Sequence, residues 1–534
     1  MNEISQRIWL CCVWLCLFPP LATAQTVGTL RIESGLLAGV HGSDSVVMVY
    51  KGLPFAAPPV GDLRWRPPQS PHTWEGVRLA DSFGPGCVQH LAGSRPPWTE
   101  EFMHQGHVNE DCLYLNVWTA AENAEAQHPV LVYIHGGGFS EGSGSVAVYD
   151  GEELAKKGLL VVTVNYRLGV FGFLAHPELT AESGHNASGN YGLLDQIAAL
   201  RWVRQNIAAF GGDPNNVTIA GQSAGAISVH LLTASPIAAG LFQRAIVQSG
   251  PGGLASFGLS SSRSVAGPLA EAEASGVTFA AAGGASSLRE LRVMSVDQLT
   301  AASAIDSRPM RFGPVIDGYV LPRDVATIYA ERAQNDVPML TGFNADEASA
   351  FPGYGKATIE EFHRTARERY GESADAFLAL YPVETDEEAG DAQKTSLRDA
   401  AAVALGHMAA ERALTARTDA YLYYFERGIP WPERPEFGAF HTAEVPYIFD
   451  NLKLLDQPWE AVDRQLADAM SSYWVNFATW GDPNGEGLPT WPAYGEAPRT
   501  LMVLGERLGP REIPADETRR AFFDAQFGGS TTRP

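Results

Sequence analysis

A serine stands between two glycines near the middle of the chain, in the stretch VTIAGQSAGAISVHLL from Val217 to Leu232. Residues 217–219 are β-branched and predict the end of a buried strand, whereas apolar residues follow at helical spacing from Ala224 onward. Glycine suits so sharp a corner because it has no side chain where the backbones crowd. The same corner would expose the Ser223 hydroxyl in a strained position, as in a nucleophile elbow.

A serine nucleophile needs a base to take its proton and an acid to orient that base. In folds with this elbow, the acid and then the histidine follow the serine along the chain, each on a loop after a strand. The stretch VPMLTGFNADEASAF predicts a strand over Val337–Thr341 and then a loop that holds Asp346 and Glu347. Spacing alone does not choose between these two carboxylates.

The base is expected after the acid. The stretch AYLYYFERGIPWPERPEFGAFHTAEVPYIF predicts a strand over Tyr421–Phe425 and a long loop that reaches His441. Most of the 13 histidines precede the acid, and His363 and His407 lie in helical contexts that are charged or rich in alanine. Because His441 lies on a loop of glycine and aromatic residues after a strong strand, we select it as the base.

An oxyanion site would have to come from an earlier loop. Val130–Ile134 predicts a buried strand, and His135 and Gly136–Gly138 follow at once. Bare glycines let backbone N–H groups approach a ligand closely, as the stabilisation of a tetrahedral oxyanion requires. A simple tight turn is the alternative interpretation, but three consecutive glycines after a buried strand favour the oxyanion loop. We expect His135 to brace this loop rather than to move protons.

The elements that must position these residues belong to a long, acidic chain. Its 534 residues would allow two to four domains on length alone, and its formal net charge of −23 argues against nucleic acid as a partner. The acidic residues are scattered, which predicts a solvated surface rather than a cation-binding patch. Residues 252–303 are rich in small residues, and we interpret them as helices of an insertion rather than a domain boundary.

The amino terminus predicts export. Arg7 precedes the apolar run Ile8–Phe18, and residues 22–24 (Ala-Thr-Ala) supply a small-residue cleavage pattern. We expect removal of residues 1–24 and a mature chain that starts at Gln25 and is secreted or periplasmic. No later apolar run reaches the length of a membrane span, so no stable membrane anchor is expected.

Cysteine usage agrees with export. Of five cysteines, Cys11, Cys12 and Cys16 would leave with the signal segment, and Cys87 and Cys112 would remain. Two cysteines in an exported chain favour one disulfide over a metal site. Closing a loop of this length should stabilise the protein by roughly 3 kcal/mol in the chain-entropy model.

Long motifs in the chain resemble the type-B carboxylesterase and cholinesterase family. FGGDPNNVTIAGQSAG (Phe210–Gly225) resembles its serine signature, and EDCLYLNVW (Glu110–Trp118) resembles its second signature, although Ala120 departs from the usual end of that pattern. Further similar stretches, which extend the resemblance from about residue 26 to about residue 510, are YKGLPFAAPPVGDLRWRPP, VNYRLGVFGFL, NYGLLDQIAALRWVRQNIAAFGGDP and WGDPNGEGLPTWPAY.

The resemblance implies one large α/β-hydrolase domain over residues 25–534, with a central, mostly parallel sheet flanked by helices and with helical insertions. It implies Ser223 as nucleophile, His441 as base and Glu347 as acid, since the family places the acid second in an Asp-Glu-Gly motif; here Ala348 replaces that glycine. Backbone N–H groups of Gly137, Gly138 and Ala224 would form the oxyanion hole. Cys87 and Cys112 match the family's first disulfide.

The implied activity is hydrolysis of a small-molecule ester through an acyl-enzyme, with no metal or cofactor. A non-catalytic adhesion protein is the alternative from another class, but it is disfavoured because the serine, acid, histidine and glycine loop are all present. An amidase on the same fold is the alternative among enzymes, and the sequence does not separate it from an esterase. The natural ester and the oligomeric state are not specified by these residues.

Gln222 is a candidate substrate-binding residue. Cholinesterase-like members of the family have a glutamate immediately before the nucleophile, where this chain has a neutral amide. A carboxylate there would favour a cationic alcohol group, by up to about 3 kcal/mol at roughly 5 Å and an effective dielectric near 20. Gln222 therefore predicts a preference for neutral or anionic esters over choline esters. The alternative is that Gln222 only supports the elbow.

Overall fold

The computed structural model describes residues 27–91, 93–251, 266–305, 308–497, 499–514 and 516–528. The predicted signal segment, its three cysteines, the cleavage site and the mature start at Gln25 all lie outside these ranges. Residues 252–265, the first part of the stretch rich in small residues, lie outside them as well.

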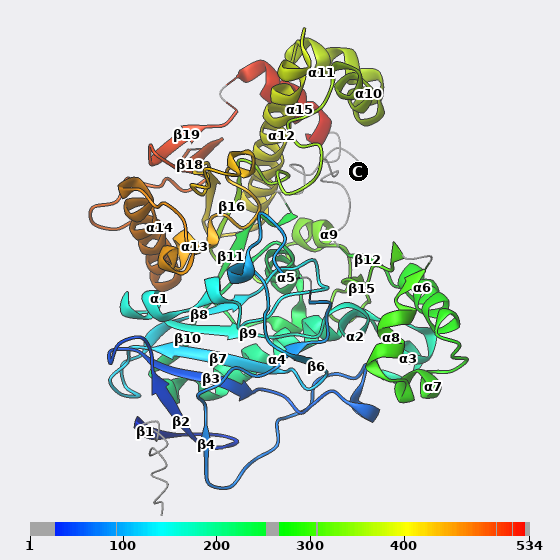
Figure 1. The fold of residues 1–534 in the computed structure, drawn as a ribbon, viewed down its shortest axis with the longest axis vertical. Helices are drawn as coiled ribbons and strands as arrows, with labels where there is room; N and C mark the ends of the chain where they lie inside the picture. The colour runs from blue at the N-terminus through cyan, green and yellow to red at the C-terminus, as the bar shows by residue number, and fades with distance from the viewer. Residues whose placement is uncertain are drawn as a thin grey trace, which may run out of the picture.

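Within the described part of the chain, a mixed sheet of 13 strands forms the centre of the molecule (Figure 1). Its middle strands are adjacent and mutually parallel. They lie in the order β9 (Leu160–Val164), β8 (His128–Ile134), β10 (Gly212–Gln222), β11 (Arg244–Gln248), β16 (Met339–Asn344), β17 (Ala420–Phe425) and β18 (Thr500–Leu504). The predicted strands before the glycine loop, the serine, the acid and the histidine are all present.

Antiparallel strands complete both edges of this sheet. They are β1 (Val27–Ile32), β2 (Gly35–His41), β3 (Met48–Pro54) and β7 (Tyr114–Thr119) at one edge and β19 (Gly509–Glu512) at the other, while β4 (Val77–Leu79) pairs with β2. Separate short pairs join β5 (Gly86–Cys87) to β6 (Val108–Asn109), β12 (Gly267–Pro268) to β15 (Val315–Ile316) and β13 (Ala304–Ile305) to β14 (Arg308–Pro309).

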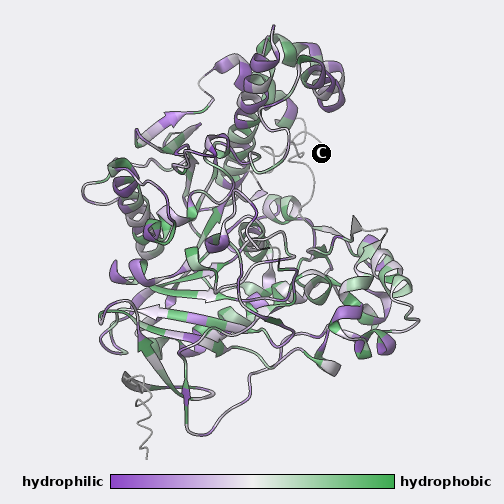
Figure 2. Ribbon diagram, viewed as in Figure 1, coloured by the Kyte–Doolittle hydropathy of each residue, from purple (hydrophilic) through white to green (hydrophobic). Residues whose placement is uncertain are grey.

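Helices cover both faces of the sheet because successive strand residues point to opposite sides. In β8, Leu131 and Tyr133 pack into one apolar core, while Val130, Val132 and Ile134 pack into another. The first core includes apolar side chains of α12 (Asp386–Thr415), α13 (Val445–Ile448) and α14 (Ala461–Trp480), and the second includes those of α4 (Tyr191–Asn206) and α5 (Ala224–Ala234). The central strands are accordingly rich in hydrophobic residues, whereas hydrophilic residues gather on the outer helices (Figure 2).

Three short helices form the predicted insertion, at the right of Figure 1. They are α6 (Leu269–Ala282), α7 (Leu288–Val293) and α8 (Val296–Ala302), and their apolar residues form a core with Phe171 and Leu179. Arg64 ties the insertion to the body of the protein, because its guanidinium donates to the Met294 carbonyl at 2.8 Å and pairs with Glu110 at 2.6 Å. The interpretation of this stretch as inserted helices is confirmed for residues 269–302.

The remaining helices have 12 residues or fewer. They are α1 (Glu152–Lys156), α2 (Gly169–Phe173), α3 (Pro177–Glu182), α9 (Val325–Ala330), α10 (Ile359–Tyr370), α11 (Ala374–Leu380) and α15 (Glu517–Gly528). Three of them, α10, α11 and α15, lie in the upper part of Figure 1. One sheet includes strands from Val27 to Glu512, so the chain forms a single large domain with insertions rather than the two to four that its length suggests.

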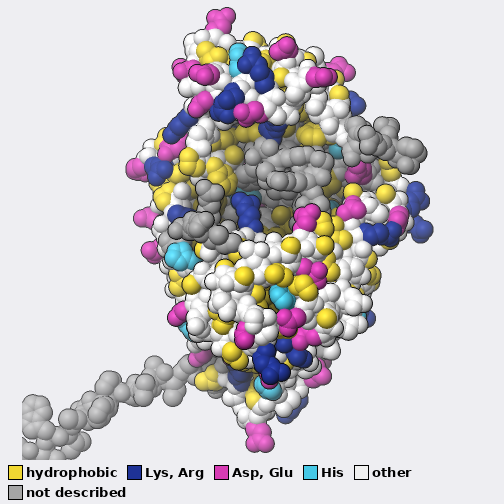
Figure 3. Space-filling model, turned by 90° about the vertical axis from the view of Figure 1, so that its right-hand side faces the viewer, with side chains coloured by type: hydrophobic (Ala, Val, Ile, Leu, Met, Phe, Trp, Pro, Cys, Tyr) yellow, Lys and Arg dark blue, Asp and Glu magenta, His cyan; other side chains and the backbone are white. Residues whose placement is uncertain are grey.

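The surface agrees with the scattered charge of the sequence on the face that Figure 3 shows. Acidic and basic side chains are interspersed there, and the face is hollowed between the upper and lower parts of the molecule. Among the described helices, none is long and apolar enough to cross a bilayer.

Candidate active site

Ser223 occupies the junction between β10 and α5. The strand ends at Gln222, the helix begins at Ala224, and Ser223 itself has φ 58° and ψ −124°. A positive φ at a residue with a side chain is strained and persists where the surroundings impose it. Here the Ser223 N–H donates to the Gln248 carbonyl at 3.0 Å, which fixes the corner against β11. The side chain is left partly exposed at the carboxyl end of the parallel strands.

The two glycines around Ser223 are required by the close approach of neighbouring backbone. A Cβ at Gly225 would lie 2.0 Å from the Ile134 carbonyl oxygen, and one at Gly221 would lie 2.5 Å from the Gly225 carbonyl. Any larger residue would have to push α5 away from the end of β8. The two glycines of the Gly-x-Ser-x-Gly pattern therefore allow close backbone packing, and the same sharp corner exposes the Ser223 hydroxyl.

The glycine loop lies beside the serine because β8 and β10 are neighbouring parallel strands whose carboxyl ends meet. A Cβ at Gly136 would lie 3.0 Å from the Cβ of Ser223. Gly137 and Gly138 have φ values of +104° and +61°, which favour glycine. Among the described residues, neither these two N–H groups nor that of Ala224, the first residue of α5, has an acceptor.

His135 is buried beneath this loop. Its Nδ1 lies 2.8 Å from the Gly136 carbonyl oxygen, its ring stacks on Tyr166 at 4.4 Å, and the Tyr166 hydroxyl donates to the His135 carbonyl at 3.0 Å. Burial lowers the pKa of His135 to about 4, so the ring is neutral at ordinary pH. These contacts fit a residue that holds the loop in place.

The structure joins Glu347 to His441. The Nδ1 of His441 donates to the Glu347 carboxylate, whose other oxygen accepts the Asn344 N–H at 2.8 Å. The Glu347 side chain is fully buried, whereas the His441 side chain is 12% exposed. Burial alone would lower the pKa of His441, but the adjacent Glu347 carboxylate outweighs it, and the pKa lies above its usual range.

Asp346, the other carboxylate that spacing alone does not exclude, faces away from His441. Its carboxylate pairs with Arg398 at 2.5 Å and accepts bonds from the Tyr354 hydroxyl at 2.9 Å and the Ala439 N–H at 3.0 Å. β16 also runs further than expected, over Met339–Asn344 instead of Val337–Thr341, because it pairs with β17 as far as Asn344. The acid loop therefore begins directly at the end of the strand.

Gln222 lies against the ring of His441. Its Nε2 lies 3.4 Å from Nδ1 and 3.3 Å from Nε2 of the imidazole, and the residue is 1% exposed. The Gln222 amide thus lies between the elbow and the histidine loop. This position fits the supporting role, which is one of the two interpretations of Gln222 from the sequence.

A second buried carboxyl group, Glu444, was missed in the sequence. It is fully buried and accepts bonds from Asn344 Nδ2 at 2.5 Å and Gln248 Nε2 at 3.4 Å. Burial, with the nearby Glu347 charge, raises the pKa of Glu444 to about 7, and its charge in turn raises the pKa of His441. The available signal was an acid three residues after the histidine within an apolar run, HTAEVPYIF.

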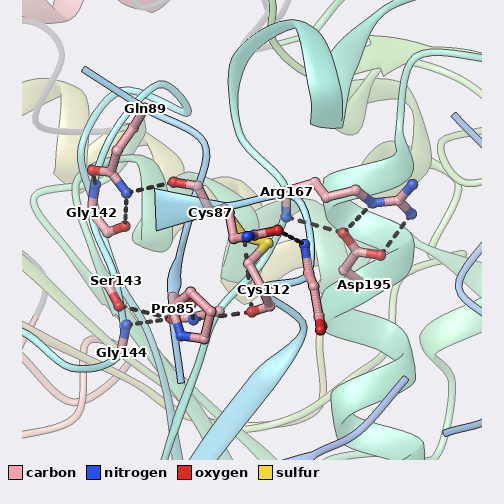
Figure 4. Close-up of a disulfide and its surroundings, with 12 residues drawn as sticks. Pro85, Cys87, Gln89, Cys112, Gly142, Ser143, Gly144, Arg167 and Asp195 are labelled. Carbon is pink, nitrogen blue, oxygen red and sulfur yellow. Dashed lines mark hydrogen bonds and ion pairs between the residues drawn. A yellow bond between two sulfur atoms is a disulfide. The ribbon is translucent and has the colours of Figure 1, made fainter. Parts of the chain in front are cut away.

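The disulfide between Cys87 and Cys112 supports the glycine loop (Figure 4). Gln89, two residues after Cys87, donates to the Gly142 carbonyl at 2.8 Å and accepts the Gly142 N–H at 2.7 Å. Asn165 joins the same region, because it donates to the Cys112 carbonyl and accepts the Gly144 N–H. The predicted pairing of these two cysteines is present.

The segment between the two cysteines also contacts the histidine loop. The Trp98 indole donates to the His441 carbonyl at 3.2 Å and the Thr442 hydroxyl at 3.0 Å, and the rings of Phe102 and Phe440 pack edge to face. One covalently closed segment therefore touches both loops that flank Ser223. In the described residues, no group of three or more His, Cys, Asp or Glu side chains is placed to hold a metal ion.

Comparison with known proteins agrees with this geometry. The model of the carboxylesterase family matches residues 26–517. The chain belongs to the carboxylesterase family. The fumonisin B1 esterase of Sphingopyxis macrogoltabida is 39% identical to this esterase over 510 residues, which cover 90% of this chain and 87% of the relative.

Other relatives are esterases as well. The para-nitrobenzyl esterase of Bacillus subtilis is 35% identical, with 91% of this chain and 96% of the relative covered, and the human cocaine esterase is 33% identical, with 91% and 88% covered. A solved PNB esterase structure superposes with a TM-score of 0.75 at 32% identity, covering 92% of this chain and 98% of that one. The protein is therefore a carboxylic-ester hydrolase with the α/β-hydrolase fold.

The titration of His441 tests the electrostatics of this esterase site. Glu444→Gln removes a negative charge that raises the pKa of His441 but keeps an acceptor for Asn344, so the pKa of His441 should fall. NMR titration of the labelled imidazole measures this directly. Glu436→Gln is the matched control, because Glu436 is exposed and pairs with Arg434. Equal titration of His441 in the wild type and Glu444→Gln would contradict the assignment.

Proposed function

We propose that the enzyme hydrolyses a small-molecule carboxylic ester through a Ser223–His441–Glu347 triad and an acyl-enzyme intermediate. The observation that carries the proposal is the buried Glu347–His441 hydrogen bond beside the Ser223 elbow, with the glycine loop against the same serine. This is the geometry that activates a hydroxyl nucleophile, since the carboxylate at Nδ1 holds the imidazole in the tautomer whose Nε2 acts as the base.

The reaction has two half-steps. Ser223 Oγ attacks the ester carbonyl while His441 Nε2 takes the hydroxyl proton, and collapse of the tetrahedral intermediate passes that proton to the departing alcohol. Water then attacks the acyl-serine, gives its proton to His441, and releases the acid as Ser223 regains a proton. Glu347 stabilises the imidazolium in both half-steps, in keeping with the raised pKa of His441.

The oxyanion of each intermediate is assigned to the N–H groups of Gly137, Gly138 and Ala224. Support comes from the position of the glycine loop against Ser223 and from the helix start at Ala224, where the first N–H groups have no partner within the helix. Each such donor contributes roughly 3 kcal/mol of transition-state stabilisation on precedent. Gln89 and the disulfide hold the loop from behind.

The relatives are named as esterases for different small molecules: fumonisin B1, para-nitrobenzyl esters and cocaine. We infer a small-molecule ester as substrate here as well. A panel of esters that varies acyl length and alcohol size, with one matched amide, would define the preferred class.

Ser223→Ala should lower ester hydrolysis by several orders of magnitude without changing the fold, because triad members act as a unit. Circular dichroism and thermal unfolding establish that the variant is folded. A sulfonyl fluoride should label the wild type at Ser223 alone, as peptide mass spectrometry would show. Labelling at another residue, or a fully active Ser223→Ala protein, would refute the triad.

The wild type should show no preference for a choline ester over its uncharged 3,3-dimethylbutyl analogue, because Gln222 carries no charge. The ratio of the two kcat/KM values measures this, and a tenfold preference for the choline ester would mean that other residues bind the cation. Gln222→Glu separates the two interpretations. If Gln222 contacts the alcohol group, Gln222→Glu should raise the ratio of kcat/KM for the choline ester to that for its analogue. If Gln222 only supports the elbow, the variant should lower kcat equally for both esters. The burial of Gln222 against His441 favours the supporting role.

Export with cleavage after Ala24 is proposed on the amino-terminal pattern, and the disulfide between Cys87 and Cys112 is consistent with it. Peptide mapping of exported protein without reductant should give a mature end at Gln25 and a linked Cys87–Cys112 peptide.

Cys87→Ser should lower the free energy of unfolding by roughly 2–5 kcal/mol. The Cys87→Ser/Cys112→Ser double variant should lose no more than the single one. Free thiols in the exported protein would contradict the disulfide, and a mature end other than Gln25 would contradict the cleavage site.

A further inference from the structure

A cavity of about 330 Å³ lies between α12, α15 and the strands β17 and β18. Figure 1 shows α12, α15 and β18 in the upper part of the molecule. Tyr494 on the cavity wall donates through its N–H to Ala420, the first residue of β17, whereas the loop that carries His441 follows the opposite end of that strand. The cavity is therefore separate from the catalytic site, and its volume lies in the range of small-molecule sites.

The cavity exists because one face of α12 carries small residues. Ala402, Gly406 and Ala410 follow at intervals of four and so lie along one side of the helix. A Cβ at Gly406 would meet no atom within 4 Å, which shows how open the space is at that position. Leu422 and Leu501, each 2% exposed, form the opposite wall on the sheet. A mainly apolar body would fit between these two surfaces.

Two arginines, Arg499 and Arg520, also line the cavity. Arg520 is 7% exposed and donates through Nη2 to Glu512 at 3.0 Å and to the Pro514 carbonyl at 2.7 Å. Its buried Nε has no acceptor among the described residues. Arg499 is exposed at the cavity and forms no salt bridge within the described part of the chain.

The acidic side chain in the wall is already engaged. Asp524 accepts a bond from His407 Nε2 at 3.0 Å, and the carboxylate of Glu512 is held by Arg520. The cavity therefore combines apolar walls with the Arg499 guanidinium, the unpaired Nε–H of Arg520 and a carboxylate, Asp524, that is already hydrogen-bonded to His407. Guanidinium groups favour carboxylates, to which they donate two parallel hydrogen bonds. This combination suits an anion with an apolar body and disfavours a cation.

We propose that this cavity binds an amphiphilic monocarboxylate, a molecule with an apolar chain and one carboxylate, such as a medium-chain fatty acid. The chain lies along the Ala402–Ala410 face of α12, and the carboxylate lies at Arg499 with Arg520 behind it. The site is independent of the roles assigned to Ser223, His441 and Glu347.

Calorimetry on the full chain tests binding, with the catalytic serine first blocked by a sulfonyl fluoride so that an acid cannot occupy the ester site. Loss of ester hydrolysis verifies the block. Decanoate should bind with one molecule per chain and at least about tenfold more tightly than decanol or decyltrimethylammonium, since the carboxylate makes charge-assisted bonds. Absence of decanoate binding, or equal binding of the three probes, would overturn the proposal.

Two variants localise the binding to this cavity. Gly406→Leu places an apolar side chain in the cavity, starting from a Cβ that meets no atom within 4 Å, and improves helix propensity, so the variant should fold, hydrolyse esters normally and lose decanoate binding. Ala413→Leu, an exposed position further along α12, is the matched control and should bind like the wild type. Arg499→Gln should weaken decanoate about tenfold and leave decanol unchanged. Unaltered decanoate binding by Gly406→Leu would place the ligand elsewhere and refute the site.

Discussion

The close approach of α5 to the end of β8 is the constraint on which the active site depends. With Gly225 in place, the helix begins against the Ile134 carbonyl oxygen, where a Cβ would lie only 2.0 Å away. Since β8 also leads into the glycine loop, this one contact sets both the direction of Ser223 and its distance from Gly136–Gly138. The buried His135 and its partner Tyr166 then hold the loop in that position.

Much of this arrangement can be predicted from the sequence because the residues that indicate it lie close together along the chain. A β-branched run, a glycine-flanked serine and a helical pattern occur within 16 residues, and each core strand precedes its functional loop directly. Strand limits were less accurate where pairing decides them. β16 runs over Met339–Asn344 rather than Val337–Thr341, because β17 supplies pairing partners that the local pattern does not show.

Contacts between distant segments could not be predicted from residue types. Whether Asp346 or Glu347 faces the histidine depends on Arg398, which pairs with Asp346 from α12. The burial of Glu444 depends on Asn344 and Gln248, at the ends of two other strands. The link from Gln89 to Gly142 joins two loops that show no shared pattern in the sequence. Family resemblance, not spacing, singled out Glu347.

The hydrogen bonds of the active site also span long stretches of chain. Glu347 and His441 are 94 residues apart, Gln222 and His441 are 219 apart, and Trp98 and His441 are 343 apart. Contacts of such separation require large loops to close and form after local helices and turns. Catalytic competence is therefore among the last properties that the folding chain acquires, and hydrolysis reports completed assembly of the sheet more stringently than helix content does.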